Sequence, residues 1–339
     1  MSSQTLASPG GAPPAAARGR VLPFPITGQE IVLIAVIAVL WVVLAFATPA
    51  FFTSGSIVPL LVAMAPIALI GIGMTVIIIT GGIDVSVASI VMVCAVVVAK
   101  AMVDSGASLP VAVLLSVVLG GLLGLINGLL IAYGRVHAII ITFGTANLFK
   151  FLGLQIFGGT TVDNIPGTLD VFGRGSAGRT LGIPHSFLIM LVIAALAWYY
   201  LRHTAGGRHL YAIGNDADAA RLAGVKVQRR VMLAYVLTGA LTGLAACFVI
   251  AQGTSTLAPN VGAGMELAAI AAVVIGGTSI MGGRGSVLGT VLGALLVQTV
   301  ASGVTQLGWR SQLSSLFIGI FILIAVGADL LRQRARRTA

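Results

Sequence analysis

Long apolar runs with few charges constrain this chain more than any other feature of its sequence. A helix that crosses a lipid bilayer needs about 20 mainly apolar residues, because the hydrocarbon core is roughly 30 Å thick. Ten segments meet or approach this requirement, and we predict spanning helices at 31–48, 57–79, 86–103, 110–133, 138–158, 185–202, 230–251, 266–281, 286–304 and 311–330. The sequence therefore predicts an all-α, polytopic membrane protein.

The low charge content supports this fold class. Only 8% of the residues are charged, against about 25% in ordinary soluble domains, so a soluble fold could not cover its surface. The 44 glycines are typical of helices that pack closely in lipid. The net charge of +10 reflects basic loops on the cytoplasmic side of a membrane, and we expect no nucleic-acid partner.

The distribution of basic residues predicts the orientation. If both termini are cytoplasmic, fourteen of the 19 Lys and Arg residues lie on the inner side, as the positive-inside rule requires. We expect a disordered cytoplasmic tail at 1–28, a membrane domain at 29–331 and a basic cytoplasmic tail at 332–339. An outer loop at 159–184 and an inner loop at 203–229 exceed the length of simple turns.

The inner loop contains a short segment with the signals of a helix. Asn215 is a good N-cap, and Asp216 and Asp218 suit the first turn because carboxylates there oppose the helix dipole. Gly224 suits the left-handed position that follows a helix. The predicted two-turn helix and its caps comprise Asn215, Asp216, Asp218, Ala219, Ala220, Arg221, Leu222 and Gly224.

A helix of this length is not stable alone in water and needs a surface to pack against. That surface is either the ends of the chain's own spanning helices or a groove on a cytoplasmic partner. The local sequence leaves both explanations open.

Four stretches together resemble the permeases of bacterial monosaccharide ATP-binding-cassette importers, over about residues 30–330. They are 206–224, TGGIDVSV at 80–87, GRVH at 134–137, and ELAAIAAVVIGGTS at 266–279 with its continuation through 281–286. Ala88 and His137 depart from residues that are common in that family, and these departures limit any inference about which sugar is carried.

The resemblance implies a ten-helix fold like that of the vitamin B12 importer, in the bacterial inner membrane. It also implies a second permease subunit, either a copy or a paralogue, two ATPase subunits and a periplasmic sugar-binding protein. Residues 215–224 would then be the coupling helix that contacts the ATPase. ATP and Mg would bind that partner, and we expect no catalytic residue, metal or cofactor in this chain. Consistently, Lys100, Lys150 and Lys226 do not follow a glycine, as a phosphate-binding P-loop requires.

Several polar residues are candidates for gating or for the translocation path. They are Asp84, Ser86, Asn127, Asn147, Gln155, Glu266 and Gln298. Asp84 could instead be the N-cap of the third span, and Glu266 a helix-start carboxylate that could alternatively contact the delivery protein. The uncharged side chains could join helices by hydrogen bonds rather than contact a sugar. Glycines at 276–285 predict either a cavity-lining break or a tightly packed turn.

Three other functions are compatible with a protein of this class. Permeases for branched-chain amino acids or nucleosides share the fold, but the GGIDVS stretch at 81–86 favours sugar importers. A stand-alone secondary transporter should carry ion-coupling carboxylates inside its spans, whereas the nine acidic residues here fall in tails, loops or span ends. A purely structural membrane protein would not need the capped inner helix.

Overall fold

The computed structural model describes residues 27–337 except 174 and 254, and the side chains as far as residue 327. Its helices are α1 (Gly28–Ala47), α2 (Ser54–Ile79), α3 (Val87–Ser105), α4 (Leu109–Gly134), α5 (Ala138–Phe157), α6 (His185–His203), α7 (Ala205–Asn215), α8 (Ala217–Leu222), α9 (Val227–Ile250), α10 (Met265–Ile275), α11 (Val287–Gln306) and α12 (Gln312–Arg337). Between α5 and α6 lie two 3-10 helices, η1 (Gly167–Phe172) and η2 (Ser176–Gly178), and an antiparallel pair of strands, β1 (Arg179–Thr180) and β2 (Ile183–Pro184).

Each of the ten predicted segments coincides with a helix, which confirms the all-α polytopic class. Within the described residues, eight helices are long and apolar enough to cross a membrane. Helix α10 has only 11 residues and ends at Ile275, so the predicted span 266–281 is too long. Gly276 caps α10 and Gly277, with φ of +94°, turns the chain away.

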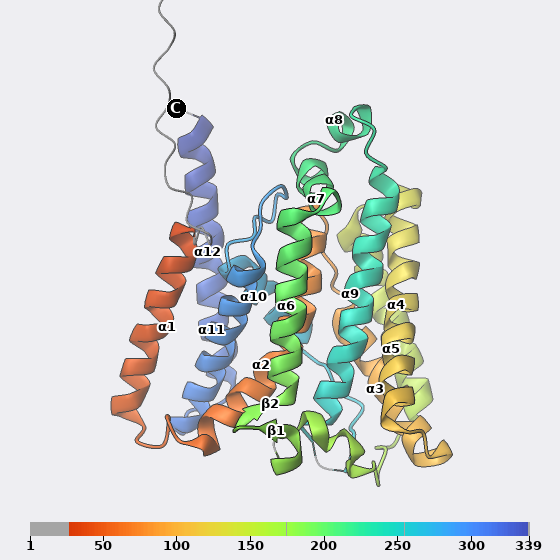
Figure 1. The fold of residues 1–339 in the computed structure, drawn as a ribbon, viewed down its shortest axis with the longest axis vertical. Helices are drawn as coiled ribbons and strands as arrows, with labels where there is room; N and C mark the ends of the chain where they lie inside the picture. The colour runs from red at the N-terminus through yellow and green to blue at the C-terminus, as the bar shows by residue number, and fades with distance from the viewer. Residues whose placement is uncertain (1–26, 174, 254, 338–339) are drawn as a thin grey trace, which may run out of the picture.

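Both ends of the described chain lie at the same end of the helix bundle (Figure 1). Helix α1 begins and α12 ends at the end that carries α7 and α8, which we call the α8 end. The predicted C-terminal tail begins as a continuation of α12, which is helical to Arg337. Residues 1–26 of the predicted N-terminal tail, and residues 338–339, lie outside the described part of the chain.

Helix α2 is the centre of the bundle. It packs against α9, α10, α11 and α6, and 89% of its most apolar 18-residue stretch is buried. In α1, α5 and α6 the corresponding share is 22%. These outer helices expose apolar side chains, as the lipid-facing surface of a membrane protein does.

Helices α4 and α9 make the most extensive helix contact, and it depends on small residues. Gly120 of α4 faces Gly239 of α9, and a Cβ at either position would overlap the other's carbonyl oxygen. Ser116 Oγ also donates a hydrogen bond of 2.6 Å to the Gly243 carbonyl oxygen. The seam is the kind of small-residue and polar contact that joins helices in lipid.

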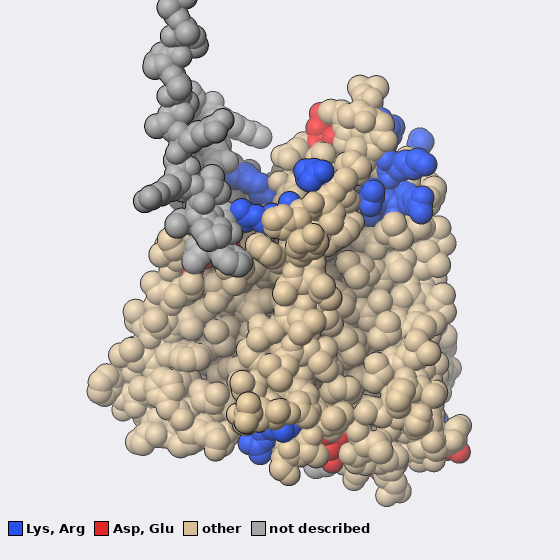
Figure 2. Space-filling model, in the orientation of Figure 1, with Lys and Arg blue, Asp and Glu red and all other residues tan. Residues whose placement is uncertain are grey.

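Charged side chains gather at the α8 end (Figure 2). Lys and Arg side chains cluster there around α7, α8 and the start of α9, whereas the visible middle of the molecule is almost free of them. The opposite end carries fewer charges on this face. This uncharged middle band matches the expectation for a protein that spans a bilayer.

Candidate functional site

The connection between α6 and α9 forms two helices rather than a loop with one helix. Helix α7 begins after Thr204, whose hydroxyl accepts a hydrogen bond of 3.1 Å from Gly207 N. Helix α7 carries no strong sequence signal, because Gly206, Gly207 and Gly214 weaken helix propensity. Burial of Leu210 and Ile213 against the rest of the chain stabilises the helix in spite of these glycines.

The caps of α8 differ from the prediction by one residue. The N-cap is Asp216, whose Oδ1 accepts hydrogen bonds of 2.9 Å from Asp218 N and from Ala219 N. The prediction that Asn215 caps α8 is wrong: Asn215 is the last residue of α7, and its Nδ2 donates to Tyr211 O. Gly224 has φ of +85°, so the predicted left-handed residue after the helix is confirmed.

Helix α8 projects from the bundle with one buried face. Ala220 is buried and packs with Ile213 and Val227, so the helix does rest on its own neighbours. Leu222, by contrast, is 91% exposed, and Ala219 is also exposed. The projecting tip of α8 therefore exposes a large apolar side chain on a helix whose other face is anchored through Ala220.

The charged side chains of α8 stabilise it only locally. Arg221 donates to Asp218 Oδ1 at 2.7 Å, and both side chains are largely exposed. This pair is the one salt bridge found among the described residues. Because exposed pairs contribute little to stability, the pair does not explain why α8 carries charge of both signs at its tip.

The base of α8 is tied tightly to the bundle. At the end of α7, Gly214 approaches the Ile79 carbonyl oxygen and Gly283 N so closely that a Cβ would overlap both. Gly283 N also donates a hydrogen bond of 2.9 Å to Ile79 O, and Tyr211 Oη donates to Gly285 O at 2.9 Å. The glycine-rich connection 276–286 is therefore packed against the end of α2 and against α7.

The turn between α2 and α3 holds three of the predicted gating residues together. Asp84 Oδ1 accepts from Ser86 N at 2.9 Å and from Ser86 Oγ at 2.6 Å, and Asn127 Nδ2 of α4 donates to Ser86 Oγ at 2.7 Å. All three residues are fully buried. Ser86, not Asp84, occupies the N-cap position of α3, so the N-cap interpretation of Asp84 is wrong.

The carboxyl group of Asp84 is poorly compensated in this network. Burial raises its pKa, and its hydrogen bonds to Ser86 and Asn127 lower the pKa only in part. Among the described residues, Asp84 Oδ2 and Asn127 Oδ1 are buried without a hydrogen-bond partner. The network is therefore a costly polar centre inside an apolar bundle.

Two residues that the sequence did not single out as part of this turn also hold it. The Ile83 carbonyl oxygen accepts from Thr142 Oγ1 of α5 at 3.3 Å and lies 3.5 Å from Tyr235 Oη of α9. Together with Asn127, these contacts join the turn to α4, α5 and α9. Tyr235 could not be recognised from sequence, because a single tyrosine in an apolar helix has no distinguishing pattern.

A cavity of about 490 Å³ separates α8 from this turn. Its walls come from both regions: Gly81 and Gly82 belong to the turn, Arg221 belongs to α8, and Tyr235 reaches the cavity from α9. Arg135, the residue that follows α4, also lines the cavity.

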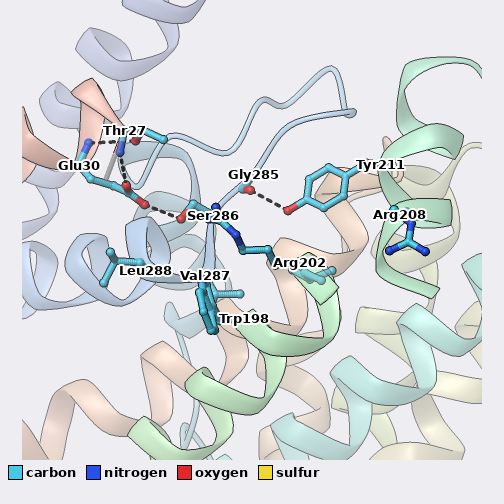
Figure 3. A pocket seen from close by; sticks show the side chains of 11 residues that line it. Thr27, Glu30, Trp198, Arg202, Arg208, Tyr211, Gly285, Ser286, Val287 and Leu288 are labelled. Atoms are coloured by element: carbon cyan, nitrogen blue, oxygen red, sulfur yellow. Dashed lines mark hydrogen bonds between the residues drawn. The ribbon is translucent and has the colours of Figure 1, made fainter. Parts of the chain in front are cut away.

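A second cavity at the same end has a volume of about 380 Å³, and the residues that attach α1 to the bundle line it (Figure 3). Thr27 and Glu30 form a capping box, and Ser286 Oγ donates to Glu30 Oε1 at 2.5 Å. Ser286 is also the N-cap of α11. The first helix is thus joined to α11 by a buried carboxylate that the sequence analysis did not identify.

The other four predicted path residues lie apart from the Asp84 network. Asn147 and Gln155 are exposed on α5, and Asn147 Nδ2 donates to Phe143 O at 2.8 Å. Glu266 lies in the first turn of α10, as predicted, and its Oε2 is buried without a partner in the described chain. Gln298 is half-buried on α11.

The fold and site define a multi-pass membrane protein with a small projecting helix at one end. Residues 56–326 match the family described as the permease component of the branched-chain amino acid transport system. The chain therefore belongs to this family of transport permeases.

Named relatives extend the similarity over nearly the whole chain. The ribose import permease protein of Escherichia coli (strain K12) is 36% identical over 89% of this chain and 92% of that protein. The ribose import permease protein of Bacillus subtilis (strain 168) is 38% identical, over 86% and 89%. The fructose import permease protein of Rhizobium meliloti is 33% identical, over 82% and 79%. No solved structure matches the chain.

Proposed function

We propose that this chain is the membrane-spanning permease subunit of an ATP-driven importer and that α8 receives the force from a separate ATPase. The observation that carries the proposal is the contrast within α8. Its tip presents Leu222, 91% exposed, while its base is fixed to Ile79 and Gly283 through Gly214. A helix with an exposed tip, on a base that is closely packed against the bundle, suits contact with a partner protein.

The proposed cargo is a monosaccharide. Relatives similar along most of the chain are named as import permeases for ribose and fructose, and the TGGIDVSV stretch at 80–87 favours the same class. Branched-chain amino acids are the alternative cargo, because the matching family is described by them. Affinity for the cargo would reside mainly in a periplasmic sugar-binding protein that delivers it.

The proposed assembly contains two permease subunits, either copies or paralogues, within the lipid of the bacterial inner membrane. Two ATPase subunits would bind ATP and Mg beneath the α8 end. The basic side chains gathered at that end (Figure 2) favour its placement in the cytoplasm, with both termini on the same side. This chain itself would catalyse no reaction.

The proposed translocation path runs along α5. Asn147 and Gln155 are eight residues apart on this helix, so they lie on one face, and both are exposed. An amide exposed to lipid is unfavourable, so this face suits a wet path shared with the second permease subunit. Glu266 and Gln298 remain further candidates for lining it.

The proposed gate is the turn that contains Asp84 and Ser86, held by Asn127. When ATP binding closes the ATPase dimer, the force on α8 would pass through α7 to Ile79, the last residue of α2. The turn that follows Ile79 would then shift against α4, α5 and α9. The cavity between α8 and the turn gives this movement space.

Purification of the tagged full chain from its native membranes in a mild detergent tests the assembly. Mass spectrometry of the co-purifying proteins should recover an ATPase with a P-loop and a sugar-binding protein. Repeated isolation of the chain alone from otherwise intact complexes would contradict the ATP-driven proposal.

Uptake of labelled ribose, fructose and leucine by cells with and without the chain tests the cargo class. Loss of uptake of one of the sugars, with leucine uptake unchanged, is expected. Loss of leucine uptake alone would favour the branched-chain amino acid alternative.

A further inference from the structure

A basic pocket lies where α7, the α8–α9 connection and the start of α9 meet. It has a volume of about 360 Å³ and is lined by His209, Gly224, Val225, Lys226, Arg229, Arg230 and Leu233. Three of these side chains are cationic, and none of the described residues that line the pocket is acidic. It is separate from the cavity that lies between α8 and the Asp84 turn.

The cations of this pocket lack an internal counterion. Within the described part of the chain, the one salt bridge is between Arg221 and Asp218, and neither residue lines the pocket. Three unpaired cations close together repel one another unless an anion lies between them. The pocket therefore presents a net positive charge that an external anion would neutralise.

Two further groups of the pocket are available to an anion. Lys226 is the N-cap of α9, and no side chain caps this helix end, so the first-turn N–H groups and the positive end of the helix dipole favour a negative ligand. The imidazole of His209 also lines the pocket. The N–H groups of the helix end and the cations match the oxygens of a phosphate.

The apolar surface beside the pocket indicates which phosphate it would take. Leu233 and Leu237 are 42% and 39% exposed, and they follow Arg229 at intervals of four residues, on one face of α9. This face continues from the pocket toward the uncharged middle of the bundle. A free phosphate would not use it, whereas the acyl chains of a lipid would.

We propose that this pocket binds the phosphodiester headgroup of an anionic phospholipid, with its acyl chains along Leu233 and Leu237. The bound lipid would neutralise Lys226, Arg229 and Arg230 at the point where α8 joins α9. The lipid would therefore fix the connection that follows the projecting helix. This inference concerns lipid binding and is tested without measuring transport.

Native mass spectrometry of the full-length chain in detergent, titrated with phosphatidylglycerol or phosphatidylcholine, measures the binding. We expect one phosphatidylglycerol to bind more tightly than phosphatidylcholine. Because a basic residue near an anionic lipid contributes about 1 kcal/mol, Arg229→Gln/Arg230→Gln should weaken phosphatidylglycerol binding about tenfold or more. Lys226→Gln alone should weaken it about fivefold.

The matched control is Arg208→Gln/Arg284→Gln, which removes the same charge from the same end but outside the pocket. It should change phosphatidylglycerol affinity less than about twofold, because pocket contacts are kept. Equal weakening by the control and pocket variants would overturn the proposal. Displacement of the lipid by inorganic phosphate at similar concentration would overturn the lipid as the ligand and leave a free-phosphate site.

Discussion

Helices α2 and α8 are opposites in burial, yet the end of α2 meets the end of α7, which immediately precedes α8, in the close contact at Gly214. Most of α2 is buried among other helices, so its apolar residues are satisfied within the chain. Leu222 of α8 is almost fully exposed outside the uncharged band of the bundle. Apolar residues of one chain thus serve two purposes: those of α2 build the bundle, whereas we propose that Leu222 of α8 contacts a partner.

This comparison predicts that changes at the base of α8 affect folding, whereas changes at its tip affect only the proposed coupling. The contact at Gly214 separates the two regions. Substitutions on either side of it, taken in order of expected effect, test the distinction.

The largest effect is expected for Gly214→Ala. The added Cβ would overlap the backbone at Ile79 and Gly283, and backbone cannot move aside as a flexible side chain can. We expect the free energy of unfolding to fall by about 2 kcal/mol or more, seen as a lower thermal midpoint in detergent. The control Gly144→Ala, at an exposed α5 position with open space, should not lower the midpoint. Equal midpoints would show that the base is not tightly packed.

An intermediate effect is expected at Asp84. Asp84→Leu removes the acceptor for Ser86 N and Ser86 Oγ, and leaving buried donors unpaired costs about 1–3 kcal/mol. Asp84→Asn keeps an acceptor oxygen and is neutral, which suits a site where burial raises the carboxyl pKa. Thermal midpoints should therefore fall clearly for leucine and less for asparagine. The reverse order would mean that an acceptor oxygen at position 84 does not stabilise the turn.

A smaller and local effect is expected for Gly224→Ala. At φ of +85° a Cβ costs about 1 kcal/mol, which should loosen the end of α8 only. Hydrogen exchange of the amides of residues 217–223 should accelerate about fivefold, with the thermal midpoint nearly unchanged. The control Gly175→Ala, at φ of −69°, should leave exchange in α8 unaltered.

The smallest effect on stability is expected for Arg221→Ala. Its partner Asp218 is 85% exposed, and exposed pairs contribute between about 0 and 1 kcal/mol. The thermal midpoint should therefore be indistinguishable from that of the unchanged chain. A drop as large as that of Asp84→Leu would mean that the tip of α8 is part of the packed base.

The sequence predicted the helices of the bundle because hydropathy over 20 residues is a strong signal. It could not predict which helices are central. The most apolar stretches of α1 and α2 have similar mean hydropathies, 2.9 and 2.5, yet 22% of the first and 89% of the second is buried. In lipid, exposed and buried helix faces are both apolar. Burial therefore depends on small-residue contacts such as Gly120 with Gly239, which a single sequence does not reveal.

The site was predicted in part for similar reasons. Local signals indicated α8 and Gly224 correctly, but they did not distinguish Asn215 from Asp216 as the N-cap, because both residue types cap helices well. The sequence suggested Asp84, Ser86 and Asn127 separately. The hydrogen bond between Ser86 and Asn127 joins positions 41 residues apart, and Glu30 and Ser286 lie 256 residues apart. Only the fold brings these residues together.

Site-specific photo-crosslinking in native membranes would locate the surface of this chain that contacts the ATPase. A photoreactive amino acid at position 222 would probe the tip of α8, and one at position 181 would probe a similarly exposed leucine at the opposite end, 97% exposed. We expect position 222 to crosslink to a P-loop ATPase and position 181 not to do so. Crosslinking of the ATPase from position 181, with none from position 222, would show that α8 is not the contact with the ATPase.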